Sequence, residues 1–238
     1  MTPAPPVALV AGASSGIGLA AARRLLAAGW EVAALARRRD RLQALAAEHP
    51  GRVLPLPADI TREPDLDRAA AQLAAWRPQL DALLLCAGDF LLRPMEQTTP
   101  AEFEHIWRLT VWSKFALTRA LLPLLAAGAD RPPRAVLHLA SLAAHRDFPD
   151  ETAYLSAMHA VVGLARAQDA ELRPRGIRAA LVSPGTVRTE LTERHFPPAA
   201  LAGALPPAAI ADSLFHLLQT IRAGGYIPEI VHLPQNST

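Results

Sequence analysis

The chain has 238 residues, a length that suits one α/β domain or at most two small ones. Hydrophobic residues make up 51% of it and charged residues 19%, which excludes wholesale disorder. The formal net charge is only +2 and the basic residues are spread along the chain, so we expect no nucleic-acid partner.

A single cysteine, Cys86, excludes an intramolecular disulfide and a cysteine-rich metal site, and we expect no bound metal. It also fits a reducing compartment, so we expect a cytoplasmic protein. No stretch reaches about 18 uninterrupted apolar residues, so no membrane span is predicted. Residues 1–6 lack the basic start and long apolar run of a signal peptide, and we interpret them as a loose leader.

Short apolar runs alternate with longer segments of helical period, which predicts a single α/β domain over residues 7–238. The predicted strands are Val7–Ala11, Glu31–Ala36, Arg52–Leu56, Ala82–Cys86, Ala135–Ala140, Ile177–Ser183 and Ile227–Leu233. The predicted helices are Gly16–Ala28, Asp40–Glu48, Glu63–Ala75, Pro100–Ala126, Ala153–Leu172 and Ala208–Arg222. Such apolar strands are typical of a parallel sheet covered on both faces, so the alternation predicts a doubly wound parallel sheet, the Rossmann fold.

The turn after the first strand is rich in glycine and small polar residues. Its members are Gly12, Ser14, Ser15, Gly16, Ile17 and Gly18, and the glycines are spaced G-x-x-x-G-x-G. Gly12 allows a tight turn, Gly16 admits a pyrophosphate and Gly18 lets the helix pack close to the sheet, while the helix N-terminus faces the phosphates. The turn therefore indicates dinucleotide binding, although an ordinary glycine-rich turn is the alternative.

Later segments carry a family resemblance that spans nearly the whole chain, from Val7 to Pro234. With the glycine turn they are Asp59 and Ile60 after the third strand, Cys86-Ala87-Gly88 after the fourth, Ser141 placed 13 residues before Tyr154, and the turn Pro184, Gly185, Val187, Thr189. In these features the chain resembles the short-chain dehydrogenase/reductase family. The resemblance implies that Asp59 contacts adenine, that Cys86-Ala87-Gly88 replaces the family's Asn-Ala-Gly, and that the last turn holds the nicotinamide end.

The end of the second strand indicates which nicotinamide cofactor is bound. An acid there usually grips a free ribose 2′-hydroxyl, but this strand continues into Arg37, Arg38 and Arg39. Guanidinium groups match phosphate geometry, so Arg37 first and Arg38 second are predicted to bind a 2′-phosphate. We therefore expect NADP(H) as the cofactor, the alternative being that these arginines only begin the next helix in solvent.

The resemblance implies hydride transfer to or from a small-molecule carbonyl or alcohol, with Tyr154 as proton donor and Ser141 as its partner. Two catalytic positions depart from the family: Met158 replaces the lysine four residues after the tyrosine, and Thr110 replaces the asparagine of the long helix. An unperturbed tyrosine has a pKa of about 10, so reduction, which uses the neutral phenol, should suffer less than oxidation. We expect a slow or reduction-biased enzyme, or a binding protein that has lost catalysis.

The chain offers few substitutes for the two missing groups. Lys114, the only lysine, lies one helical turn beyond Thr110 and is interpreted as a solvated or interface residue, the alternative being that its stem reaches the relay position. His145 is interpreted as a solvent-facing loop residue, although it borders the substrate site. Cys86 is interpreted as a buried filler rather than a nucleophile.

The Pro-rich segment 186–207 corresponds to the family's substrate lid. Leu191, Phe196 and Leu201 are expected to form an apolar pocket wall, to which Asp89, Phe90 and Phe148 add, for a small or medium carbonyl compound. By resemblance, the helices around 100–126 and 153–172 imply a homodimer or homotetramer. Trp107, Trp112 and Phe115 lie on the first of them.

Overall fold

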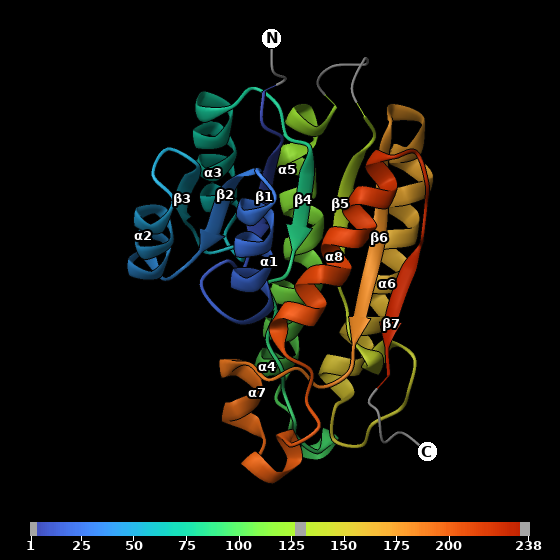
Figure 1. Ribbon diagram of the computed structural model, residues 1–238. Coiled ribbons are helices and arrows are strands. Elements are labelled where there is room, and N and C mark those ends of the chain that lie inside the picture. Colours follow the sequence, from blue (N-terminus) through green and yellow to red (C-terminus); the bar gives the residue numbers. More distant parts are fainter. Residues whose placement is uncertain (1–3, 127–131, 234–238) are drawn as a thin grey trace.

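A computed structural model describes residues 4–126 and 132–233, and its centre is a seven-stranded parallel sheet (Figure 1). The strands are β1 Val7–Ala11, β2 Glu31–Ala36, β3 Val53–Pro57, β4 Ala82–Leu85, β5 Arg134–Leu139, β6 Ile177–Pro184 and β7 Glu229–His232. Their spatial order is β3-β2-β1-β4-β5-β6-β7, with parallel pairing throughout. The predicted doubly wound parallel sheet is confirmed.

Helices cover both faces of the sheet, because the central strands are buried on both sides and need two apolar layers. The helices are α1 Gly16–Ala27, α2 Arg39–Glu48, α3 Glu63–Trp76, α4 Pro100–Trp107, α5 Ser113–Leu125, α6 Thr152–Leu172, α7 Glu190–His195 and α8 Pro207–Arg222. Helices α1, α2 and α8 cover one face, and α3 and α5 cover the other with α6 beside them (Figure 1). Their apolar side chains form the buried clusters on the two faces. None of the helices in the described ranges is both long and apolar enough to cross a bilayer.

The helix predicted over Pro100–Ala126 is interrupted by a π-helical turn. Arg108–Trp112 forms this turn between α4 and α5, and Thr110 lies within it, fully buried. A π turn inserts an extra residue into the helical repeat, which the period of the sequence does not reveal. The turn offsets α5 from α4 close to the carboxyl end of β4.

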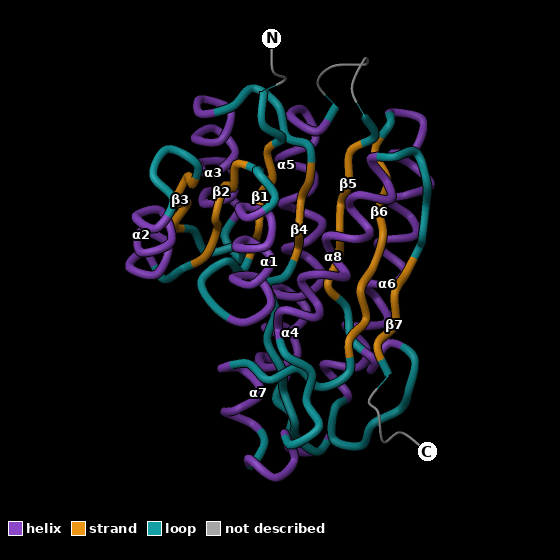
Figure 2. Tube along the Cα trace, viewed as in Figure 1, coloured by secondary structure: helices purple, strands orange, loops and turns teal. Residues whose placement is uncertain are grey.

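The carboxyl ends of the strands lie at one end of the molecule, where loops and α7 gather below the sheet (Figure 2). Segment 186–207, expected to be a Pro-rich lid, contains α7 and a short 3₁₀ helix, Pro198–Leu201. Thr189 begins α7 with a capping box, in which it accepts a hydrogen bond from the Thr192 amide at 3.2 Å. The segment is thus folded across the end of the sheet where a doubly wound fold binds its ligand.

The described part of the N-terminal leader, residues 4–6, runs directly into β1. The Pro6 carbonyl accepts a hydrogen bond from the Glu31 amide at 2.9 Å, so pairing toward β2 begins one residue before the strand. Residues 1–3 of the leader, and the last five residues including Asn236, lie outside the described residues.

Candidate active site

A cleft of about 970 Å³ runs along the carboxyl ends of the strands. Every residue predicted to bind the cofactor or to act in catalysis lines it, although these residues come from seven separate segments of the chain. They are Gly12, Ser14, Ser15, Gly16, Ile17, Gly18, Arg37, Arg38, Asp59, Ile60, Cys86, Ala87, Gly88, Ser141, Tyr154, Pro184, Gly185, Val187 and Thr189.

The glycine turn fits a dinucleotide because its glycines lie where neighbouring backbone comes too close to admit a side chain. A Cβ on Gly18 would lie 2.3 Å from the Gly12 carbonyl oxygen, and one on Gly12 would lie 2.9 Å from the Ala87 nitrogen. Gly12 also has φ +87°, which favours glycine. Ser15, at the N-cap of α1, does not cap the helix with its side chain, so amides at this N-terminus remain available to an anion.

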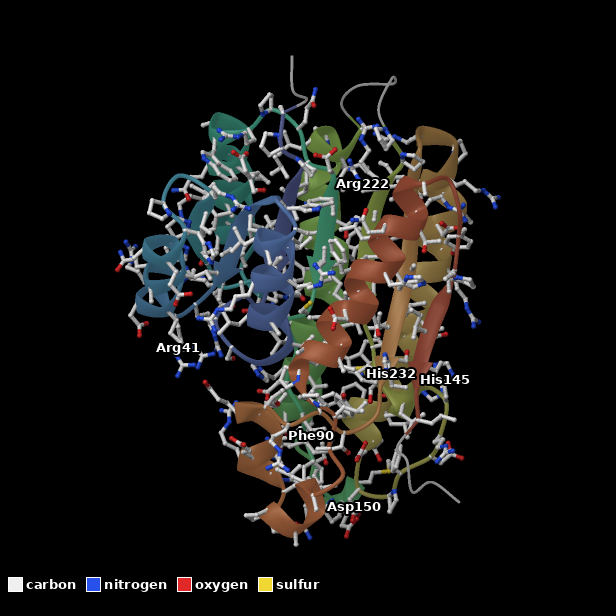
Figure 3. The ribbon with its side chains drawn as sticks, viewed as in Figure 1. Arg41, Phe90, His145, Asp150, Arg222 and His232 are labelled. Atoms are coloured by element: carbon white, nitrogen blue, oxygen red, sulfur yellow. The ribbon has the colours of Figure 1, made fainter. Side chains whose placement is uncertain are left out.

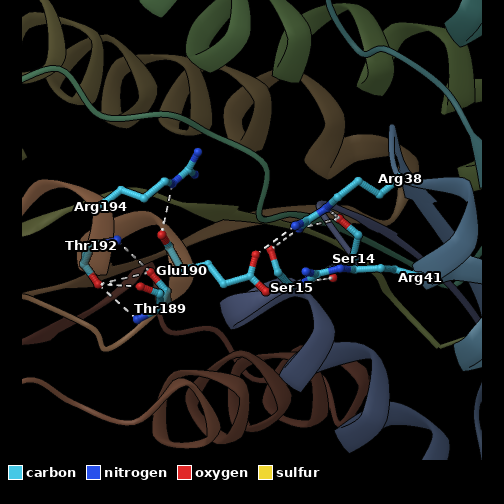
Figure 4. Close-up of polar contacts among 8 residues, drawn as sticks. All are labelled: Ser14, Ser15, Arg38, Arg41, Thr189, Glu190, Thr192 and Arg194. Carbon is cyan, nitrogen blue, oxygen red and sulfur yellow. Dashed lines mark hydrogen bonds and ion pairs between the residues drawn. The ribbon is translucent and has the colours of Figure 1, made fainter.

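The two arginines predicted to bind the phosphate differ in their contacts and exposure. Arg38 donates to Ser14 Oγ at 3.0 and 3.1 Å and to Glu190 Oε2 at 2.8 Å (Figure 4). Arg37 is exposed and lies near Asp59. Burial acts to raise the pKa of Asp59, but hydrogen bonds from Thr61 and the charge of Arg37 outweigh it and lower that pKa. Arg37 is therefore the more readily available guanidinium.

Tyr154 and Ser141 meet in the same cleft. Both residues line it, and the Tyr154 ring packs edge-on against Phe90 with centroids 4.8 Å apart. Burial raises the pKa of Tyr154 to about 12, although the neighbouring Ser141 hydroxyl opposes the rise. Met158 is only 4% exposed and packs in the same apolar cluster as Tyr154. The phenol is therefore held in its neutral, proton-donating form.

Lys114 is buried, so its interpretation as a solvated residue is wrong. It is 3% exposed, and Nζ donates to the Leu85 carbonyl at 2.6 Å and the Ala87 carbonyl at 3.4 Å. Its stem runs into the interior because α5 packs against β4. Burial lowers the pKa of Lys114 to about 8, and its charge acts on the titration of Cys86 and His138 rather than of Tyr154. Lys114 links α5 to the end of β4 through these hydrogen bonds. It does not lower the pKa of Tyr154 as the family's lysine would.

Glu151 is a cleft residue that the sequence reasoning missed. It lines the cleft one helical turn before Tyr154, is 9% exposed, and burial raises the pKa of its carboxyl to about 7. Its charge also acts to raise the pKa of Tyr154. The spacing of three residues on one helix was a signal that could have identified it.

The substrate end of the cleft is aromatic. Phe90, Phe148, Leu191 and Phe196 line it as expected, and Phe90 lies 5.5 Å from Phe196 between ring centroids. Phe90 lies below the sheet beside α7 (Figure 3). Leu201 was wrongly expected in this wall: it is 2% exposed and lies outside the cleft lining, because the 3₁₀ turn that carries it folds inward.

Two further residues, His145 and Cys86, lack the surroundings of a catalytic side chain. His145 is exposed and bonds through Nε2 to Glu229 Oε1 at 2.6 Å, at the foot of β7 (Figure 3). Burial raises the pKa of the Cys86 thiol to about 12, although the charge of Lys114 opposes it. The thiol is therefore protonated at neutral pH, which agrees with its interpretation as a filler.

The fold and the cleft define a class of protein: an α/β nucleotide-binding protein with its ligand site at the carboxyl ends of parallel strands. The profile of the short chain dehydrogenase family matches residues 6–199, and the chain belongs to this family. Proteins of this family are oxidoreductases that bind a nicotinamide cofactor and act on small molecules.

Individual relatives agree with this assignment. A short chain dehydrogenase of Pseudocercospora fijiensis is 33% identical over 77% of this chain and 60% of its own length. The 2-(R)-hydroxypropyl-CoM dehydrogenase of Xanthobacter autotrophicus is 34% identical over 79% of this chain and 76% of its own. The 3-ketoacyl-(acyl-carrier-protein) reductase of Brucella melitensis, solved with NADH, has a TM-score of 0.85 at 26% identity and covers 95% of this chain and 96% of its own.

Proposed function

We propose that this protein is an NADP(H)-dependent carbonyl reductase in which Tyr154 donates the proton. The observation that carries the proposal is the placement of Tyr154 and Ser141 in the same cleft as the glycine turn. A bound nicotinamide supplies the hydride. The Tyr154 hydroxyl protonates the carbonyl oxygen as the hydride adds to carbon, and Ser141 hydrogen-bonds that oxygen.

The cofactor would lie along the whole cleft. Gly12, Gly16 and the N-terminus of α1 would hold the pyrophosphate, and Arg37 and Arg38 the 2′-phosphate. Asp59 would face adenine, and Pro184 to Thr189 the nicotinamide end. The aromatic substrate end favours a small or medium carbonyl compound with an apolar substituent, because Phe90 and Phe196 offer ring faces and edges but no fixed charge.

A second candidate is a non-catalytic NADP(H)-binding protein. The observation that favours it is Met158, which is buried beside Tyr154 where the resemblance implies a lysine. Thr110, at the family's asparagine position, is buried, and its hydroxyl has no hydrogen-bond partner among the described residues. Such a protein would keep the cofactor cleft and lose turnover.

Turnover of NADPH against a panel of aldehydes and ketones separates the two candidates, with Tyr154→Phe as the matched variant. We expect measurable reduction in the wild type, a loss of at least about a hundredfold in Tyr154→Phe, and cofactor affinity unchanged within about twofold. Equal turnover in both proteins would reject Tyr154 as the acid. Cofactor binding without turnover on any substrate would favour the non-catalytic candidate.

The cofactor preference has its own test. NADPH should bind more tightly than NADH, and Arg37→Ala should weaken NADPH by about tenfold while leaving NADH nearly unchanged, because a charge-assisted hydrogen bond is worth about 1.5–3 kcal/mol. Equal affinities in the wild type would reject the preference.

We also propose that the protein is cytoplasmic and forms a homodimer or homotetramer through α4, α5 and α6. Phe115 is 49% exposed on α5, and Phe103 stacks on Trp107 with centroids 5.8 Å apart on α4. Exposed aromatic side chains on adjacent helices suit an interface between copies. Sedimentation of wild type and Phe115→Glu tests it: a monomeric wild type would contradict the proposal.

A further inference from the structure

Glu190 reaches across the mouth of the cofactor cleft to two arginines. Its carboxylate accepts a hydrogen bond from Arg38 Nη1 at 2.8 Å through one oxygen and from Arg41 through the other (Figure 4). Glu190 is the first residue of α7, whereas Arg38 and Arg41 lie at the start of α2. One carboxylate therefore bridges the substrate lid and the end of β2.

The geometry of this contact suits an oxyanion. Arg38 and Arg41 converge on the two oxygens of one group, and Arg38 is further oriented by Ser14 and Ser15 of the glycine turn. Two guanidinium groups facing one anion is the arrangement that also binds phosphate. Arg38 is one of the two arginines proposed above for the 2′-phosphate, and Arg41 lies one helical turn beyond it.

We propose that Glu190 competes with the 2′-phosphate of NADP(H) for Arg38 and Arg41. This competition would limit how strongly the enzyme prefers NADPH over NADH. This inference rests on the NADP(H) preference proposed above. The carboxylate carries one negative charge, whereas a phosphate monoester carries about 1.5–2 at neutral pH and has three acceptor oxygens. The 2′-phosphate therefore displaces Glu190 rather than the reverse.

Displacement is feasible because the contact is exposed. The side chains of Arg38, Arg41 and Glu190 are 39%, 43% and 47% exposed, so water screens the ion pairs and solvates the released carboxylate. Displacing Glu190 also frees the first residue of α7 from α2. Part of the binding free energy of the 2′-phosphate is therefore spent on releasing the lid, and NADH, which lacks that phosphate, leaves the contact intact.

The test measures the dissociation constants of NADPH and NADH by fluorescence titration for the wild type, Glu190→Gln and Glu171→Gln. Glu171 is exposed on α6, lies outside the cleft lining and has no ion pair among the described residues, so its substitution controls for the loss of one negative charge. We expect Glu190→Gln to tighten NADPH by about five- to tenfold and to leave NADH within twofold. Glu171→Gln should change neither by more than twofold.

Three results would overturn the inference, and they are distinguishable from a failure of the proposed preference. Equal tightening of both cofactors in Glu190→Gln would mean that Glu190 acts on a phosphate that the two share. Weaker NADPH binding would mean that Glu190 positions the arginines instead of competing for them. If the wild type prefers NADPH and Glu190→Gln has the same affinities as the wild type, the contact does not affect cofactor binding. If neither protein prefers NADPH over NADH, both this inference and the proposed cofactor preference are rejected.

Discussion

Tyr154 titrates in an environment that supplies no positive charge. Burial raises its pKa to about 12, so roughly one part in 10⁵ is phenolate at pH 7. Reduction uses the phenol, which is fully populated, whereas alcohol oxidation needs the phenolate as base. Oxidation by the wild type should therefore rise about tenfold per pH unit between pH 7 and 10.

Met158→Lys should restore oxidation more than reduction. An ammonium beside Tyr154 would lower the pKa of the phenol, so the oxidation profile should shift by at least one unit to lower pH. Met158→Leu keeps the position apolar and should keep the wild-type profile. A thermal melt must accompany the measurement, because an amine buried at this position costs stability. A folded Met158→Lys protein that binds NADPH but oxidises no alcohol would argue for the non-catalytic candidate.

Glu151 should make stability fall as the pH rises. Its pKa is about 7 in the folded protein against 4.5 in the unfolded chain, so the folded state binds more protons between these values. The free energy of unfolding therefore decreases from pH 4.5 to 7, by up to about 3 kcal/mol at about 1.4 kcal/mol per pKa unit. Urea unfolding of Glu151→Gln should lack this slope and exceed the wild type above pH 7. Exposed Glu193→Gln should retain the slope, and a slope that persists in Glu151→Gln would assign it to another group.

At the scale of elements, the approach of α1 to β1 depends on Gly18. A Cβ there would lie 2.3 Å from the Gly12 carbonyl, and backbone must move to admit it. Gly18→Ala should lower the free energy of unfolding by about 1–3 kcal/mol or more and weaken cofactor binding. The matched control is Gly163→Ala on α6, where no atom lies within 4 Å of the added Cβ and Ala should be neutral or stabilising by up to about 1 kcal/mol. Equal effects of the two substitutions would contradict the close approach.

At the scale of the whole molecule, Lys114 couples the stability of the fold to alkaline pH. Burial lowers its pKa to about 8 from 10.5, so between these values the unfolded chain holds more protons and the free energy of unfolding rises with pH. Lys114→Met should remove this rise, measured by chemical unfolding from pH 7.5 to 10. Arg119→Met, an exposed substitution on the same helix, should leave it in place. A rise that persists in Lys114→Met would assign it to another group.

What the sequence by itself determined was local and periodic. The alternation of apolar strands with helical segments specified the parallel sheet, because a strand buried on both faces admits few polar residues. The glycine turn was readable because its glycines follow the first strand at a fixed spacing, although the atoms that exclude a Cβ at Gly12 belong to Cys86 and Ala87. The order of strand, turn and helix then placed six loops at one end of the sheet and indicated most of the cleft.

The tertiary structure alone decided which side chains from distant segments meet. The π turn at Arg108–Trp112 inserts a residue that no hydrophobic period records, and α5 then directs Lys114 into the interior. Glu190 meets Arg38 across some 150 residues of chain, so its role depends on how α7 folds back over the cleft. Burial, which raises the pKa of Glu151, is a property of the packed molecule and has no local signature in the chain.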